Sequence, residues 1–239
     1  MINDNKISKY LLYAIGEIVL VVIGILIALQ INNANEIRKN QITESKYIEE
    51  MLEDFEINLQ SSEKSLSALY RDLPALIELL KQSTLETPTV SIDSINKMFS
   101  FMQSMPFYSS TDRVYNNIMG SGDLKLITSS ELKTALSNYY KALNVINIVQ
   151  STHEMVLVQQ VQPYIIENLD FQAVFFKRIN DYELPPPKEM NRIMEVLKDR
   201  KFRSVVVTKL AILEDLLQQN LIMEKLNSDI VDLLKEFQK

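Results

Sequence analysis

The sequence predicts an all-α protein in which one N-terminal transmembrane helix continues into a long-helix antiparallel bundle. Residues 11–31 are predominantly apolar with Glu17 as their only charged residue, and the 239-residue chain contains only four glycines. In two later stretches, apolar residues recur at alternating steps of three and four. Such spacing places side chains on one helix face, and so few glycines argue against a fold rich in β-turns.

The apolar segment, residues 11–31, predicts a membrane anchor. Its 21 residues rise about 31 Å as a helix, enough to cross a bilayer core. The segment is longer than the apolar part of a signal peptide and ends Ala28-Leu29-Gln30-Ile31, without an A-x-A-like cleavage site. We therefore expect a short tail at 1–10, a retained transmembrane helix at 11–31 and a bundle at 32–239. A short tail usually stays in the cytoplasm, which predicts a single-pass bacterial inner-membrane protein with a periplasmic bundle.

The first helical seam follows the anchor without an intervening Pro or Gly. Eight residues recur at steps of four and three: Ile48, Leu52, Phe55, Leu59, Ser62, Leu66, Leu69 and Leu73. Pro74 is expected to break or kink this helix, with Asp72 capping the next one. Ser91 can cap a short helix to about residue 103, and Gly120 can stop another helix after Met119.

The second seam belongs to the longest predicted helix, which Thr128 and Glu131 open as a capping box. It consists of Leu132, Leu136, Tyr139, Leu143, Ile146, Gln150, His153 and Leu157. Pro163 is expected to kink or end this helix. The remaining predicted elements are a short helix at 171–179, a stiff connector at Pro185, Pro186 and Pro187, and helices at 188–199 and 201–237. The last helices carry an apolar stripe of Leu210, Leu213, Leu217, Leu221, Ile230, Leu234 and Phe237.

Composition excludes several function classes. The net charge is −6, from 25 basic and 31 acidic residues, so the chain lacks the basic footprint of a nucleic-acid-binding protein. It contains no Cys, which excludes disulfides, thiolate catalysis and cysteine-based zinc sites. No catalytic motif is present. We therefore expect a protein without enzymatic activity, cofactor or metal.

Glu17 is the residue that most suggests function. A carboxylate in a spanning helix costs a few kcal/mol and normally faces protein or water. Gly24 and Ala28 form a small-xxx-small pair that permits close helix approach, and spacings of seven and four place them on the face of Glu17. Three interpretations remain open: a tolerated, partly hydrated carboxylate, a charge that pairs with a membrane partner, or a site coupled to protons or cations.

Two further groups of residues in the predicted bundle could bind an anion or set the register of the helices. The turn Gly120-Ser121-Gly122-Asp123, with Arg113 nearby in sequence, could present backbone N–H groups to an anion. It lacks phosphate-loop spacing, so a tight corner between helices is favoured. Gln150 and His153 predict a polar layer that sets bundle register, which is favoured over a metal site completed by other helices.

The stretch Lys9-Tyr10-Leu11-Leu12-Tyr13-Ala14-Ile15-Gly16-Glu17-Ile18, with Val22 to Asn33 (VIGILIALQINN), resembles the uncharacterised, membrane-anchored helical proteins widespread in Bacteroidota. Ala34 stands where members usually have Trp, which removes an anchor at the membrane interface. The resemblance implies no known activity. It does imply that Gly16, Glu17, Asn32 and Asn33 act as a unit, because a mere tether needs only hydrophobicity.

These observations predict a non-enzymatic accessory or scaffold subunit. Its transmembrane helix is expected to dock to an integral membrane protein or to another copy within the lipid bilayer. An ion-coupled envelope machine that uses Glu17 is the first alternative, by analogy of layout. A periplasmic ligand-sensing bundle is the second, although such sensors normally have a second span and a cytoplasmic output domain.

Overall fold

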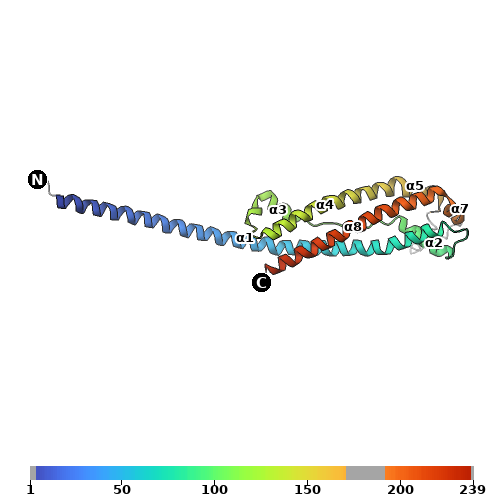
Figure 1. Cartoon of the computed structure of the whole chain (residues 1–239), viewed down its shortest axis with the longest axis horizontal. Helices are drawn as coiled ribbons and strands as arrows, with labels where there is room; N and C mark the ends of the chain where they lie inside the picture. Colours follow the sequence, from blue (N-terminus) through green and yellow to red (C-terminus); the bar gives the residue numbers. More distant parts are fainter. Residues whose placement is uncertain (1–3, 171–191, 238–239) are drawn as a thin grey trace, which may run out of the picture. The chain divides into compact units, whose positions relative to one another are not determined.

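Every regular element in the described part of the chain is a helix, which confirms the predicted all-α class (Figure 1). The structure, a computed structural model, describes residues 4–170 and 192–237, with side chains from Tyr10 onward. The helix predicted at 171–179 and the prolines at 185–187 lie outside the described residues. The bounds of the elements are as follows: α1 Asp4–Gln82, α2 Ile92–Met102, α3 Arg113–Ser121, the 3-10 helix η1 Asp123–Leu126, α4 Ser130–Val156, the π-helix η2 Leu157–Val161, α5 Gln162–Asn168, α7 Ile193–Lys198 and α8 Arg200–Glu236.

The chain divides into two compact units. The first consists of Met1–Met51 and Val114–Thr128, and the second consists of Leu52–Arg113 and Ser129–Lys239. We call the second unit the bundle. The helix α1 contributes to both, and it begins at Asp4, so most of the expected tail at 1–10 is helical.

In the first unit, side-chain hydrogen bonds hold the segment after α3 to α1, and the Thr128 amide and hydroxyl both donate to Glu44. Tyr47 Oη donates to Asp123 Oδ2 at 2.8 Å, and Thr128 Oγ1 donates to Glu44 Oε1 at 2.7 Å. The buried apolar side chains of this unit are Tyr47, Ile48, Met51, Val114, Ile118 and Ile127.

The predicted capping box of α4 is wrong, since Thr128 is bonded to Glu44. Ser129 is the N-cap residue of α4, and its hydroxyl accepts a hydrogen bond from the Leu132 amide at 3.0 Å. Ser, like Thr, satisfies a free amide at a helix start. The helix therefore begins where expected to within about one residue, with a different cap.

Three long helical segments build the bundle: residues 52–82 of α1, α4 and α8. Lys235 Nζ lies 2.9 Å from Glu56 Oε1, and Lys209 bonds to His153, so α8 runs antiparallel to its neighbours. Residues 103–112 carry the chain back along the bundle between α2 and α3 (Figure 1). For this reason α1 and α4 run in the same direction, and only α8 is antiparallel to both.

The predicted seam of α4 is confirmed at every position. All eight side chains, from Leu132 to Leu157, are at most 6% exposed. The seam of α1 is confirmed at six of eight positions. Leu52 and Leu59 are half-buried, whereas Met51 and Asn58 fill the core. Asn58 can be buried there because its side-chain amide donates to the Thr111 carbonyl oxygen and accepts from the Thr111 amide.

The helix α1 passes through Pro74 and ends at Gln82, so the predicted break at Pro74 is wrong. Pro74 is exposed, where the carbonyl that it leaves unbonded can be solvated. Asp72 is fully buried and does not cap a helix; its Oδ1 accepts a hydrogen bond from Arg71 Nε at 2.8 Å.

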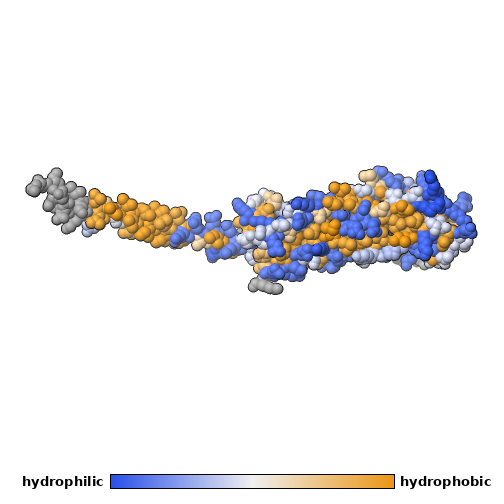
Figure 2. Space-filling view, viewed as in Figure 1, coloured by the Kyte–Doolittle hydropathy of each residue, from blue (hydrophilic) through white to orange (hydrophobic). Residues whose placement is uncertain are grey.

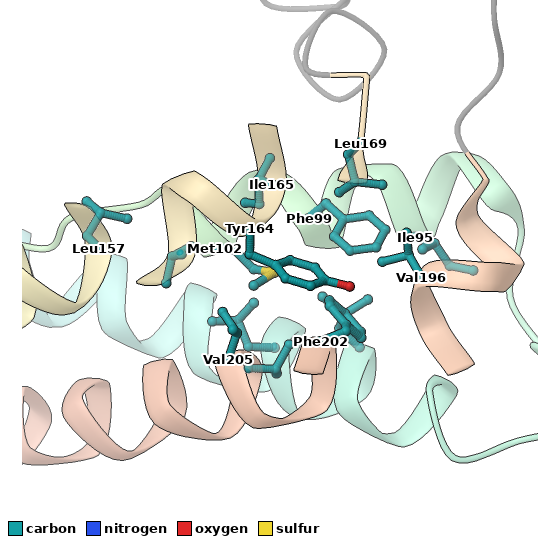
Figure 3. Close-up of a cluster of buried hydrophobic side chains, with 14 of the residues drawn as sticks. Ile95, Phe99, Met102, Leu157, Tyr164, Ile165, Leu169, Val196, Phe202 and Val205 are labelled. Atoms are coloured by element: carbon teal, nitrogen blue, oxygen red, sulfur yellow. The ribbon is translucent and has the colours of Figure 1, made fainter. Parts of the chain in front are cut away.

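An aromatic cluster lies at the end of the bundle where α8 begins (Figure 3). The Phe202 ring lies 5.4 Å from the Phe99 ring and 6.0 Å from the Tyr164 ring, measured between centroids. Tyr164 Oη donates to Asp199 Oδ2 at 2.7 Å, and Asp199 caps α8. Burial raises the pKa of Tyr164, which keeps its hydroxyl a donor. The cluster thus joins α2, α5 and α8 in one core.

Candidate functional site

The apolar segment, residues 11–31, has no protein around it in the described chain. Its large apolar side chains and Tyr13 remain 47–80% exposed, and Figure 2 shows hydrophobic surface along it. Among the described residues, one helix is long and apolar enough to cross a membrane, and this segment supplies its apolar part. Soluble monomers rarely expose so large an apolar surface. The segment therefore needs a cover of lipid or protein.

Glu17, Gly24 and Ala28 share one face of this helix. At 100° per residue, their directions fall within about 40° of one another. Asn32 lies at the edge of this face, whereas Gly16 and Asn33 point away from it. We call Glu17, Gly24 and Ala28 the small-polar face.

No described part of the chain requires the two glycines of the segment. A Cβ atom added at Gly16 or Gly24 would meet no other atom within 4 Å. Gly16 instead leaves a shallow hollow on the helix surface. The hollow is lined by Leu12, Tyr13, Gly16, Glu17, Leu20 and Val21. Such a hollow is the shape into which a side chain of a neighbouring helix packs.

The glycine turn is a tight corner in the structure. α3 passes through Gly120 to Ser121, and Gly122 takes the left-handed conformation with φ of 73°. This is the backbone conformation in which a glycine commonly ends a helix. The predicted stop at Gly120 is therefore displaced by two residues. The Asp123 carboxylate accepts a hydrogen bond from the Tyr47 hydroxyl.

Arg113 is engaged with carboxylates. Its Nη2 lies 3.2 Å from Asp54 Oδ1 and 4.0 Å from Glu53 Oε2. Two acidic neighbours neutralise the guanidinium and make it a weak receptor for an anion. The contacts support a structural role for Arg113.

A buried lysine joins three parts of the bundle. Lys209 of α8 is fully buried, and its Nζ donates to the Ser104 carbonyl oxygen at 2.8 Å. The same Nζ bonds to His153 Nε2 of α4, which is also fully buried. His153 Nδ1 has no hydrogen-bond partner among the described residues. We call Lys209, His153 and the Ser104 carbonyl the lysine centre.

Burial shifts both basic groups toward their neutral forms. It lowers the pKa of Lys209 to about 7, against the opposing charge of Asp72. Burial, and to a lesser extent the charge of Lys209, together lower the pKa of His153 to about 3. A deprotonated amine near neutral pH is a nucleophile, but full burial denies it a substrate. The lysine centre is therefore suited to a structural role, in which it joins α8 to α4 and to the segment after α2.

A second polar group lies farther along the bundle, around Tyr139, which precedes His153 on α4 by 14 residues, or about four turns of helix. The hydroxyls of Tyr108 and Tyr139 are 2.8 Å apart, and Asn58 Nδ2 donates to Tyr139 Oη at 3.1 Å. Asn227 Nδ2 donates to Tyr108 Oη at 3.2 Å, and Gln150 Oε1 accepts from the Tyr108 amide at 2.6 Å. Gln150 thus binds the returning segment to α4, whereas His153 joins α4 to α8 through Lys209.

Sequence reasoning missed Lys209, Asn220 and Asn227, although a signal was present. The fully buried residues of α8 step by four and three: Phe202, Val206, Lys209, Leu213, Leu216, Asn220, Met223, Asn227, Ile230 and Leu234. The predicted stripe followed leucines instead, and Leu210 and Leu217 are only half-buried. A periodic seam that admits polar residues would have found all three.

The described residues contain no group of three or more His, Asp or Glu side chains that could hold a metal ion. The sequence model of a family of unknown function, DUF6090, matches residues 17–154. Comparison with curated proteins and with solved structures finds no match. The matched range starts at Glu17 and includes His153, whereas α8 with Lys209 lies beyond it.

Proposed function

Starting from the fact that the chain belongs to the DUF6090 family of unknown function, we propose that it is a membrane-anchored, non-enzymatic scaffold subunit. Its apolar segment spans the membrane and docks to a membrane partner through the small-polar face. The bundle is presented on the periplasmic side of a bacterial inner membrane.

One observation carries this proposal: a carboxylate and two small residues share a face of a helix that no described part of the chain covers. Glycine or alanine lets helix backbones approach closely, and a carboxylate in the bilayer gains most from a protein partner. Neither Gly16 nor Gly24 is needed by the chain itself. Gly24, which lies on the small-polar face, is therefore available for close approach of a partner helix.

The test is affinity capture of the full chain from native membranes in mild detergent, followed by mass spectrometry. We expect Glu17→Gln and Gly24→Leu to lose a defined membrane partner, at least tenfold relative to the natural chain. Leu26→Phe is the matched control, since it adds bulk on the opposite face of the same helix. Helical content by circular dichroism should be equal in all four proteins.

Equal recovery of all partners with Glu17→Gln and Gly24→Leu would contradict docking through this face. If, in addition, Glu17→Gln removed a cellular function while assembly stayed intact, ion coupling through Glu17 would replace the scaffold role. Loss of partners with Leu26→Phe as well would mean that the contact with the partner is not confined to the small-polar face.

A further inference from the structure

The helix α4 carries a second seam, on the side that faces away from the bundle core. Val145, Ile148 and Met155 are 45%, 67% and 54% exposed, and the intervening Thr152 is also exposed. These four residues step by three, four and three, which is the spacing of a coiled-coil seam. We call them the outer seam. It lies about 160° around the helix from the buried seam of Gln150 and His153.

The outer seam is more apolar than its composition indicates. Thr152 Oγ1 donates to the Ile148 carbonyl within the helix at 2.9 Å, so the hydroxyl is satisfied and the methyl group is available for packing. In Figure 2, hydrophobic surface lies over the middle of α4. The flanking residues Asn144 and Ser151 are exposed and uncharged.

Charge is absent from this region to an unusual degree. Residues 142–166 contain one residue of the Asp, Glu, Lys and Arg class, Glu154, although the chain average of 23% would place about six there. Glu154 lies about 120° around the helix from Ile148, outside the outer seam. Depletion of charge at the centre of an exposed apolar face is typical of protein–protein interfaces.

We propose that the outer seam pairs with the outer seam of a second copy of this chain. When two identical helices pair in parallel, each seam residue meets its own equivalent, so any charged residue would face a like charge. The four residues of the outer seam avoid this cost, and the nearest charge on the same face is the exposed Lys141, one turn of helix before Val145. By contrast, a groove between the start of α4 and the end of α8 is lined by Glu131, Asp229, Asp232 and Glu236 and would repel a second copy of a chain with net charge −6.

Anchoring strengthens this pairing, and here the inference rests on the proposed function. Copies held in one membrane share an orientation, which favours parallel over antiparallel pairing of their bundles. Confinement also raises the effective concentration of one copy around another. A seam of four residues is short, and pairing by the free bundle in solution would be weaker.

The chain offers a direct test because it contains no Cys. A single introduced cysteine can form a disulfide only with the same cysteine of another copy, and only if the two Cα atoms approach to about 7 Å. We expect Val145→Cys, Ile148→Cys and Met155→Cys in the full chain, reconstituted in lipid vesicles, to form dimers under mild oxidation. Asn147→Cys and Glu154→Cys are the controls, exposed on the same helix but off the outer seam, and should cross-link at least five times more slowly.

A second variant separates pairing from folding. Ile148→Glu in the Val145→Cys background should reduce cross-linking at least tenfold, with helical content and unfolding unchanged. Asn147→Glu adds the same charge one residue away and should change it less than twofold. Equal cross-linking at seam and control positions, or none at any position, would overturn the proposal.

The cross-linking pattern and the capture experiment fail independently. Periodic cross-linking on α4, with capture unaffected by Glu17→Gln and Gly24→Leu, would leave self-pairing intact and remove docking through the small-polar face. Capture sensitive to those two changes, without periodic cross-linking, would do the reverse. If Ile148→Glu instead removed a different captured protein, the outer seam would belong to that partner and self-pairing would be wrong.

Discussion

Two apolar runs in this chain each contain one charged residue, and the structure treats them in opposite ways. In residues 11–31, Glu17 stands on a helix whose apolar neighbours are all exposed. In residues 205–213, Lys209 is fully buried and bonded to His153 and to the Ser104 carbonyl. The comparison teaches that a charge in an apolar run can be satisfied within the chain itself, as Lys209 is, whereas no described part of the chain supplies a partner for Glu17.

The largest expected difference between the two regions concerns side-chain truncation. Phe202→Ala removes a fully buried ring that lies against Phe99 and Tyr164, and we expect it to lower the free energy of unfolding by about 4 kcal/mol. Ile23→Ala, in the apolar segment, should leave that free energy unchanged, since Ile23 has no described protein contact to lose. Denaturant titrations of the full chain in detergent, followed by circular dichroism, measure both.

A comparable loss with Ile23→Ala would mean that the apolar segment contributes to the folding of the bundle, and the contrast between the regions would not hold. A loss below about 1 kcal/mol with Phe202→Ala would contradict the close packing of the aromatic cluster.

The next largest effect is the pH dependence of stability from the lysine centre. Folding lowers the pKa of Lys209 from 10.5 to about 7, so the unfolded chain binds more protons between those values. Stability should therefore rise with pH, by on the order of 2 kcal/mol from pH 6.5 to pH 9.5. His153, lowered from 6.5 to about 3, acts with the same sign, and stability should fall as the pH drops below about 6.5.

Lys209→Met is the control for this effect, because it retains an unbranched side chain of similar length without the titrating amine. The rise in stability above pH 7 should disappear in this variant, while the decline at acid pH should remain. Chemical unfolding at fixed denaturant steps from pH 4 to pH 9.5 provides the measurement. A pH profile that is flat above pH 7 in the natural chain would show that Lys209 stays charged in the bundle.

The smallest expected effect compares two glycines. Gly122→Ala places a Cβ on a backbone with φ of 73° and should cost about 1 kcal/mol of stability. Gly24→Ala should cost nothing in the same unfolding assay, because no described atom lies within 4 Å of the added Cβ. A measurable loss of stability at Gly24 would indicate that this glycine already packs against protein when the chain folds.

Periodicity predicted the buried face of α4 at every position, but it misplaced the stripe of α8. The difference lies in the polar residues. In α4, Gln150 and His153 continue an apolar series and were included in the seam. In α8, Leu210 and Leu217 lie one residue after Lys209 and Leu216, and the series of leucines displaced the predicted face. Hydrophobicity alone does not choose between adjacent positions when a buried polar group has a partner.

The candidate sites divide in a similar way, into one that lies on a single helix and one that combines distant segments. The small-polar face could be predicted because residues on one helix keep fixed relative directions, whatever else the chain does. The lysine centre could not be predicted, because it combines α8, α4 and the segment after α2. For the glycine turn, the sequence favours a tight corner over an anion site made by backbone N–H groups beside Arg113, and the structure pairs Arg113 with Asp54 and Asp123 with Tyr47.

By itself, the sequence determined the all-helical class, the apolar segment and the buried seam of α4. These depend on spacing along one helix, where each residue turns the chain by about 100°. Only the tertiary structure decided that α1 passes through Pro74, that α1 and α4 run in the same direction, and that Lys209, Asn58 and Asp72 lie in the core. Those outcomes depend on contacts between distant segments, since a polar group enters a core only when another part of the chain supplies its hydrogen bonds or its opposing charge.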